Sequence, residues 1–208
     1  SLVGSEMCIR DRIEAVLAAE DRRFPDHPGV DWRALASSLW SRLTTGLDRG
    51  ASTITMQLSG LLDARLRPDG RKRSYRQKLE QLVAALMMER YWSKQQILEA
   101  YLNLVPFRGE LIGLGAASRG LFNKYPHGLT SAEALVLAAL IRSPSAEVSA
   151  VAARAGWLAD ATGLRLPEGE PATSAARLAG RYTIPGRAGW APHAGRRLLA
   201  GQPASVTG

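Results

Sequence analysis

The chain has 208 residues, enough for one compact domain, and its 46% hydrophobic and 22% charged residues exclude a wholly disordered protein. Its longest uninterrupted apolar run, Ala134–Ile141, is far shorter than the ~20 residues that cross a bilayer. The single cysteine, Cys8, excludes a disulfide framework, and the scattered histidines do not form a metal triad. A formal net charge of +8 predicts an anionic partner, for which nucleic acid, a phospholipid headgroup and a pyrophosphate all fit.

The two ends of the chain differ from its centre. Residues 1–12 (SLVGSEMCIRDR) have no clear periodicity and resemble a translated sequencing adapter, so we predict that this segment is non-native. A natural N-terminal anchor is then expected to be missing from this chain. Residues 146–208 are rich in Ala, Gly, Arg and Pro, which predicts short helices and loops at a domain edge, followed by a linker. The domain proper is therefore predicted over residues 13–145.

The centre of the chain is predicted to be helical almost throughout. Apolar residues recur at helical spacing over Trp32–Leu47, and a second helix is predicted over Tyr75–Tyr91. Two capping-box patterns, which begin at Ser93 and Thr130, predict the starts of two further helices. No alternating pattern is strong enough to support a sheet, so we expect a mainly α domain.

An adjacent carboxylate pair, Glu20–Asp21, follows an apolar helix predicted over Ile13–Ala19. Negative charge is unfavourable at the C-terminal end of a helix, because the helix dipole is negative there as well. The pKa of Glu20 is therefore expected to be raised, which suits a proton-transfer group. A plain surface acidic pair is the alternative interpretation. The turn that follows contains His27, which fits a structural role equally well.

Two further patterns point to an anionic ligand. In Gly50–Gln57 (GASTITMQ), a glycine leads into hydroxyl-bearing residues at a predicted helix N-terminus, where backbone N–H groups favour an anion. An ordinary N-cap is the alternative. The stretch Arg65–Lys78 holds seven basic residues against a single acidic one, Asp69, which gives it a net charge of +6. Taken alone, this stretch is equally typical of a solvated loop.

Taken in order, these patterns resemble the five motifs of the peptidoglycan glycosyltransferase domain of class A penicillin-binding proteins. The motifs are EDRRFPDHPG, GASTITMQ, a basic segment that ends at Lys78, SKQQILEAYLN and IRSP. The resemblance covers Ile13–Ser145, and both Met56 and the run Asn103–Ser118 are similar to the 1C subtype. It implies a mainly α, lysozyme-like helical glycosyltransferase domain with a small membrane-facing jaw.

The resemblance also implies an activity, the polymerisation of lipid II into glycan strands with inversion at the anomeric carbon. Glu20 would be the catalytic general base on the acceptor 4-hydroxyl, and undecaprenyl pyrophosphate would be the leaving group. Positions that match substrate-binding residues of the family are Asp21, His27, Ser52, Thr53, Thr55, Gln57, Arg73, Lys78, Gln81 and Arg142. Positions that match its fourth, structural motif are Lys94, Glu99, Tyr101 and Asn103.

Two positions depart from the family pattern. The second functional glutamate of the family is replaced by Gln81, an amide that binds a divalent cation poorly, although the 1C subtype also carries glutamine there. Gly60 stands where relatives usually have Lys or Arg for the pyrophosphate. No metal ligand and no definite cofactor are assigned, and Mg²⁺ or another divalent cation at the pyrophosphate stays open. A catalytically impaired relative that binds lipid II is an alternative.

The resemblance assigns the helix Trp32–Leu47 to the membrane-facing jaw, because two tryptophans with arginines beside them suit an interfacial helix. A core-facing amphipathic helix is the alternative. Expected partners are lipid II, the growing glycan strand, the membrane surface and a cell-wall synthesis complex. The expected location is the outer, periplasmic face of the bacterial cytoplasmic membrane, and the linker after residue 146 would lead toward a missing transpeptidase domain.

Two other functions compete with this interpretation. A lysozyme-like enzyme that cleaves glycan also needs one glutamic acid in a helical cleft, but it has no pyrophosphate for a basic segment to bind. A helical nucleic-acid-binding module fits the net charge. It leaves Glu20–Asp21 and the GASTITMQ turn without a purpose, so nucleic acid is not an expected partner.

Overall fold

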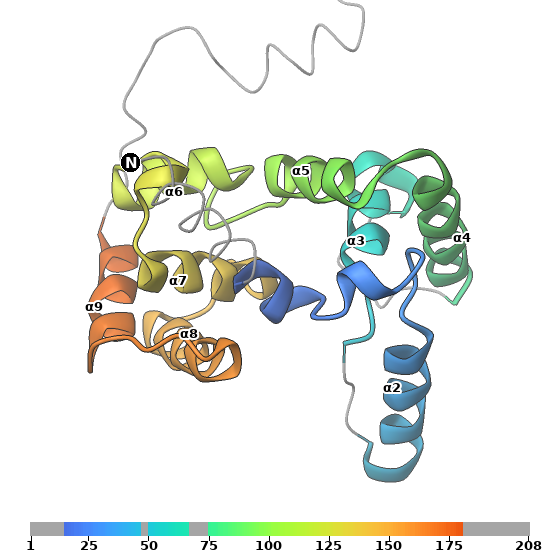
Figure 1. Cartoon of the computed structure of the whole chain (residues 1–208), viewed down its shortest axis with the longest axis horizontal. Coiled ribbons are helices and arrows are strands. Elements are labelled where there is room, and N and C mark those ends of the chain that lie inside the picture. The colour runs from blue at the N-terminus through green and yellow to red at the C-terminus, as the bar shows by residue number, and fades with distance from the viewer. Residues whose placement is uncertain (1–14, 47–49, 67–74, 181–208) are drawn as a thin grey trace, which may run out of the picture.

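The computed structural model describes residues 15–46, 50–66 and 75–180 (Figure 1). The predicted non-native segment and the substrate-binding candidate Arg73 lie outside these ranges. The helices are α2 (Trp32–Thr45), α3 (Ile54–Leu62), α4 (Tyr75–Tyr91), α5 (Lys94–Leu104), α6 (Leu114–Phe122), α7 (Ser131–Arg142), α8 (Val148–Thr162) and α9 (Glu170–Ala176). Four short 3₁₀ turns join them: η1 (Phe24–Asp26), η2 (Ala64–Leu66), η3 (Pro126–Gly128) and η4 (Arg177–Ala179).

Helical structure dominates, as the sequence predicts. Residues 15–20 are also helical, and the described ranges contain no strand, only an isolated bridge between Pro106 and Ile112. Both predicted capping boxes are confirmed. The hydroxyls of Ser93 and Thr130 accept hydrogen bonds from the backbone N–H groups of Gln96 and Glu133. The side chains of Gln96 and Glu133 accept in turn from the backbone N–H groups of Ser93 and Thr130. The chain is therefore a mainly α, lysozyme-like domain.

Most of the helices form two groups, with the segment of residues 15–31 between them (Figure 1). In one group α7 packs against α8 and α9, and in the other α3 packs against α4 and α5. Helix α7 supplies the centre of the core, since all its residues from Ala132 to Ile141 are buried. Hydrogen bonds tie the segment to both groups. The backbone N–H of Ile54 in α3 donates to Asp21, and Arg154 in α8 donates to the carbonyl of Ala19.

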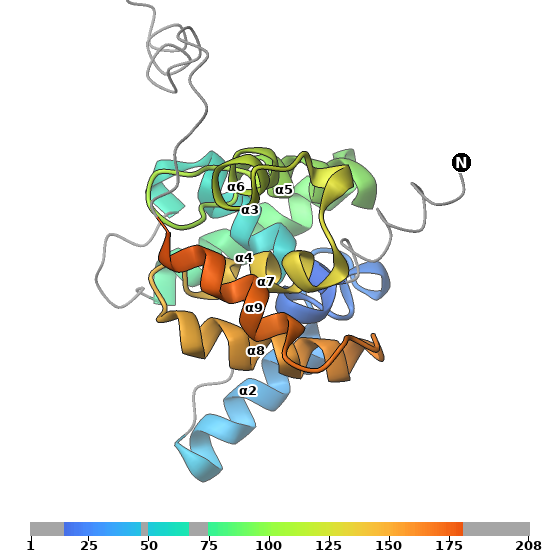
Figure 2. The same ribbon diagram turned by 90° about the vertical axis from the view of Figure 1, so that its left-hand side faces the viewer.

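Helix α2 projects from the body of the molecule in both views (Figures 1 and 2). Asp31 caps its start by accepting from two backbone N–H groups, and Gly46 ends it in the left-handed region at φ 69°. None of its residues is buried, and Trp32, Trp40 and Leu43 are 54%, 70% and 74% exposed. The alternative of a core-facing helix is therefore wrong. No helix within the described ranges has the length and apolar character to span a membrane.

Candidate active site

Glu20 lies at the end of the helix of residues 15–20, where α3 and α8 approach it. Its Oε2 accepts a hydrogen bond of 3.0 Å from Nε2 of Gln57, whereas its Oε1 is buried and has no hydrogen-bond partner. Burial raises the pKa of Glu20, and the hydrogen bond from Gln57 and the charges of Arg154 and Arg142 act in the opposite direction. The predicted rise is confirmed, but its main cause is loss of solvent rather than the helix dipole.

Tyr101 fixes the orientation of the Gln57 amide. The buried hydroxyl of Tyr101, on α5, donates to Oε1 of Gln57 at 3.0 Å. Burial raises the pKa of Tyr101, and the nearby carboxylates of Glu20 and Asp21 raise it further, so the hydroxyl keeps its proton and donates. Because Oε1 of Gln57 is occupied in this way, its NH₂ group points toward Glu20. A residue predicted to be structural thus holds the partner of the candidate base.

Arg154 is a site residue that the sequence analysis missed. Its Nη2 donates to the carbonyl of Ala19 at 3.3 Å, one residue before Glu20. Its Nε is buried without a hydrogen-bond partner, and both burial and the charge of Arg142 lower the pKa of Arg154. The sequence signal was weak, since Arg154 stands alone in a long apolar stretch outside the recognised motifs. Two arginines therefore act on the carboxylate of Glu20.

Arg142 ends α7 and stands where the fifth motif predicted it. A Cβ at Gly50 would lie 3.5 Å from its Nη1, so the exposed guanidinium of Arg142 rests against the start of the GASTITMQ motif. The structure thus brings together residues of the first, second and fifth motifs. This juxtaposition is what the predicted chemistry requires.

Asp21 and His27 are buried and hold the first motif against α3. Nε2 of His27 lies 3.0 Å from Oδ1 of Asp21, and the backbone N–H of Ile54 donates to Oδ2 at 2.9 Å. Thr53, also buried, donates to the carbonyl of Gly29 at 2.6 Å and caps α3. These contacts favour a supporting role over the direct substrate contact predicted for all three residues.

A second buried network joins the motifs behind the site. Thr55 donates to Oε1 of Glu89 at 2.7 Å, and Lys94 donates to the same oxygen at 2.7 Å. Lys94 also donates to the carbonyl of His27 and lies 4.3 Å from the ring centre of Phe24. The structural role predicted for Lys94 fits these contacts, whereas Thr55 was predicted to bind substrate and instead serves this network. Glu99 and Asn103, the other two members of the fourth motif, are exposed.

Ser52 and Lys78 are neighbours beside the N-terminus of α3. Nζ of Lys78 donates to Oγ of Ser52 at 2.6 Å, and both residues are half-buried. A cation beside a hydroxyl forms a favourable setting for an anion, because both groups can donate hydrogen bonds to it. Both residues were predicted to bind substrate, and that contact stays a prediction.

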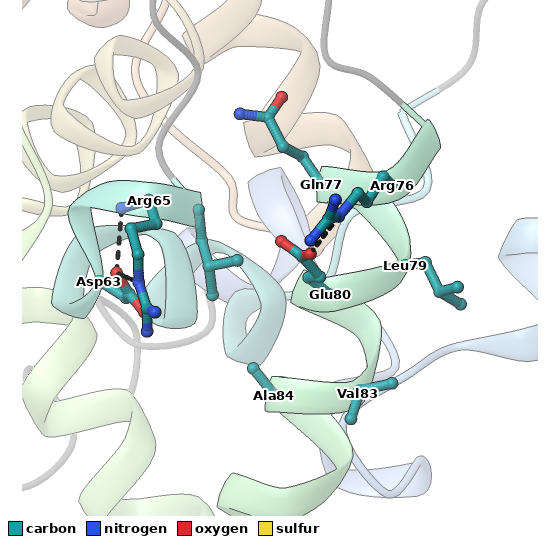
Figure 3. Close-up of a pocket in the computed structure, with 9 residues that line it drawn as sticks. Asp63, Arg65, Arg76, Gln77, Leu79, Glu80, Val83 and Ala84 are labelled. Atoms are coloured by element: carbon teal, nitrogen blue, oxygen red, sulfur yellow. Dashed lines mark hydrogen bonds and ion pairs between the residues drawn. The ribbon is translucent and has the colours of Figure 1, made fainter.

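The described part of the basic stretch lines an open pocket of about 670 Å³ between η2 and α4 (Figure 3). Arg65 and Arg76 stand at this pocket, each with an 87% exposed side chain. Each arginine is paired with a carboxylate: Arg65 lies 2.7 Å from Asp63, and Arg76 lies 2.8 Å from Glu80. Exposed pairs of this kind are weak, so an anionic ligand can compete for the guanidinium groups.

Gln81 does not face a surface that a substrate can reach. It is 2% exposed, and its Nε2 donates to the carbonyl of Leu66 at 2.7 Å. The substrate contact predicted for Gln81 is therefore corrected to a contact within the core. Among the described residues, no group of three or more His, Cys, Asp or Glu side chains could hold a metal ion. The positive charges of Arg154 and Arg142 beside Glu20 disfavour a divalent cation there.

Comparison with known proteins identifies the family. The transglycosylase family model matches residues 3–161. The chain is 42% identical over 134 residues to penicillin-binding protein 1C of Escherichia coli K12, an alignment covering 64% of this chain and 17% of that protein. It is 38% identical over 130 residues to the biosynthetic peptidoglycan transglycosylase of Mannheimia succiniciproducens, covering 62% of this chain and 51% of that one. The biosynthetic peptidoglycan transglycosylase of Acinetobacter baylyi is 40% identical over 132 residues, an alignment that covers 63% of this chain and 57% of that protein.

The chain belongs to the transglycosylase family, because the family model covers well over half of its length. The resemblance inferred from the five motifs is thereby confirmed, including the similarity to the 1C subtype. The chain spans about half the length of the curated biosynthetic transglycosylases that it matches, and a much smaller share of penicillin-binding protein 1C.

Proposed function

We propose that this chain is a peptidoglycan glycosyltransferase that polymerises lipid II. The observation that carries the proposal is the desolvated carboxylate of Glu20, held by Gln57 and flanked by two arginines. Glu20 takes the proton from the 4-hydroxyl of the acceptor sugar while that oxygen attacks the anomeric carbon of the donor. The bond from this carbon to the pyrophosphate oxygen breaks, with inversion of configuration. A raised pKa makes Glu20 a stronger base than an ordinary glutamate.

The leaving pyrophosphate needs positive charge and oriented donors on the donor side of the site. Lys78 and Ser52 supply them, and Arg142 adds a second cation at Gly50. Electrostatic stabilisation of developing charge is usually the largest contribution to catalysis of group transfer. The motifs that carry these groups are held together by buried hydrogen bonds of Asp21, His27, Thr53 and Thr55.

The direct test is an assay in which the purified chain receives labelled lipid II and, separately, preformed glycan strands. The proposal predicts that lipid II is converted to polymer with release of undecaprenyl pyrophosphate, and that the preformed strands stay intact. Cleavage of the strands without polymerisation would establish the lysozyme-like alternative. Binding of lipid II without turnover would establish the impaired relative.

The exposed face of α2 supports a further proposal, that this helix meets the membrane that carries lipid II. Trp32, Leu39, Trp40 and Leu43 are each more than half exposed on a helix that projects from the body. Arginine side chains beside apolar ones suit an interface with anionic lipid. The proposal includes a location at the outer face of the cytoplasmic membrane, together with lipid II, the glycan strand and the other enzymes of wall synthesis.

Replacing Trp40 and Leu43 with serine should weaken binding to vesicles containing anionic phospholipid by about tenfold or more, because each residue buries a large apolar side chain on insertion. Co-sedimentation with the vesicles measures the effect. Trp157→Ser is a matched control, since Trp157 is 59% exposed but lies on α8. Equal losses in the control and the α2 variant would contradict membrane contact through α2.

Replacing Arg154 with glutamine should move the acid side of the pH–rate profile to higher pH. The charge of Arg154 lowers the pKa of Glu20, so its removal raises that pKa further. A general base works only when ionised, and activity therefore rises with pH through the pKa of Glu20. Arg119→Gln is the control. The guanidinium carbon of Arg119 lies 4.9 Å from the ring centre of Tyr125, and Arg119 is not among the residues that shift the pKa of Glu20. If Arg154→Gln lowers the rate equally at every pH and leaves the acid side of the pH–rate profile in place, Arg154 does not lower the pKa of Glu20.

A further inference from the structure

The two positions that depart from the family pattern, Gly60 and Gln81, lie against each other. Gly60 is buried in α3, and a Cβ built on it would lie 3.0 Å from Nε2 of Gln81 and 3.4 Å from the carbonyl oxygen of Leu66. A Cβ contact of 3.0 Å is tighter than nine in ten real ones, so an alanine at position 60 makes the amide of Gln81 shift by a few tenths of an ångström. The amide of Gln81 thus occupies space that glycine leaves open.

The contact that Gln81 makes requires an amide. Its Nε2 donates to the carbonyl of Leu66 at 2.7 Å in a buried setting. A glutamate here would bring a carboxylate up to a carbonyl oxygen, which gives two acceptors and no donor. Alanine would leave the carbonyl of Leu66 without this donor, and an unsatisfied buried acceptor is costly. Gly60 and Gln81 therefore form one coupled feature.

The hydrogen bond of Gln81 joins the two walls of the pocket between η2 and α4. The bond ends at Leu66, which lies next to Arg65. Both residues belong to η2 and line one wall of the pocket. Glu80 and Leu79, which directly precede Gln81, line the opposite wall on α4. A bond between Leu66 and Gln81 thus fixes the separation of the walls and the place where Arg65 stands relative to Arg76.

We infer that Gln81 is a positioning residue which fastens η2 to α4, and that Gly60 is coupled to it by providing the space for its amide. This inference rests on the proposed function for its catalytic consequence, because the arginines of the pocket would bind the anionic part of lipid II. Gln81 itself touches no substrate. Where relatives usually have a basic residue and a glutamate, this chain has the neutral, buried pair Gly60 and Gln81. This pair fixes the positions of the arginines in the pocket.

The coupling is tested by a double-mutant cycle of Gly60→Ala and Gln81→Ala, followed by urea unfolding. Gly60→Ala should lower the urea midpoint in the wild-type background, because the new methyl group collides with Gln81. In the Gln81→Ala background the same change should have little effect or raise the midpoint, since the collision is gone and alanine suits a helix better than glycine. Additive shifts in the midpoint would overturn the coupling.

The positioning role is tested by the kinetics of lipid II polymerisation. Gln81→Ala should raise KM about fivefold, the equivalent of one typical hydrogen bond, and leave kcat within about twofold because the surroundings of Glu20 are unchanged. Gln81→Glu, which keeps the size but loses the donor when ionised, should also raise KM. Gln95→Ala, at an exposed position of α5, is the control for a lost glutamine.

The outcomes separate this inference from the function on which it rests. A lower urea midpoint for Gln81→Ala with unchanged KM would reduce Gln81 to a purely structural residue and overturn the positioning role. A fall in kcat alone would overturn it as well. A wild-type chain that does not polymerise lipid II would refute the proposed function, and with it the positioning role, while the unfolding cycle would still decide the coupling of Gly60 and Gln81.

Discussion

Glu20→Gln should lower the rate of lipid II polymerisation by about 10³-fold while the chain stays folded. The substitution keeps the size of the side chain and removes only its ability to take a proton, and general base catalysis typically contributes about 10²–10⁴-fold. The remaining oxygen still accepts the hydrogen bond that Gln57 donates to Oε2 at 3.0 Å. Steady-state rates with labelled lipid II measure the effect, and Glu168→Gln, at an exposed position, is the control.

The same variant should be at least as stable as the wild type at neutral pH. Burial raises the pKa of Glu20 in the folded chain above its ordinary value of 4.5. The folded state then binds the proton more tightly than the unfolded state, so stability falls as pH rises through the raised pKa. Glutamine cannot ionise and avoids this loss. A large drop in stability with the loss of activity would instead indicate that Glu20 serves the fold.

Lys78→Met should lower kcat by about 10²-fold, the effect typical of removing one group that stabilises developing negative charge. Methionine keeps the aliphatic stem of Lys78 but loses the ammonium group that lies 2.6 Å from Oγ of Ser52. The loss should be visible as slower release of undecaprenyl pyrophosphate under saturating lipid II.

Lys78→Arg is the matched variant for this prediction, because it preserves the charge while altering the geometry. It should retain part of the activity that Lys78→Met loses. If Lys78→Met polymerises lipid II as fast as the wild type, the ammonium group does not face the leaving pyrophosphate, and the donor side must be sought elsewhere.

The sequence predicted the helices well, because their boundaries have local causes. The capping boxes at Ser93 and Thr130 satisfy backbone N–H groups that any helix start leaves free, and both begin helices as expected. Helix α4 has the predicted bounds, and Gly46 ends α2 in a conformation that glycine adopts easily. Signals of this kind need no knowledge of tertiary contacts.

The candidate base could also be predicted, but its environment could not. The raised pKa of Glu20 depends mainly on burial, which results from packing between groups of helices that are far apart in the sequence. The hydrogen bond from Gln57 spans 37 positions, and that from Tyr101 to Gln57 spans 44. Arg154 lies still farther from Glu20 and has no motif around it, so only the fold brings its charge to the site.

Several hydroxyl-bearing and ionisable residues were predicted to bind substrate, and the structure turns them inward. Thr53, Thr55 and Asp21 are buried, each with a partner on another segment. A motif alone does not distinguish a side chain that touches the ligand from one that holds the motif together, because both depend on the same residue types. Burial separates the two groups, and among the described residues it leaves Glu20, Ser52, Lys78 and Arg142 as candidates for contact.

The central claim, that a desolvated Glu20 is the catalytic base, is tested most directly by titrating its carboxyl group. Carbon-13 NMR of glutamate-labelled protein would follow each carboxyl signal with pH, and the signal missing from Glu20→Gln would identify Glu20. The account predicts a midpoint above the ordinary glutamate value that coincides with the acid side of the pH–rate profile. A midpoint at or below the ordinary value, or a rate that rises in a different pH range, would contradict it.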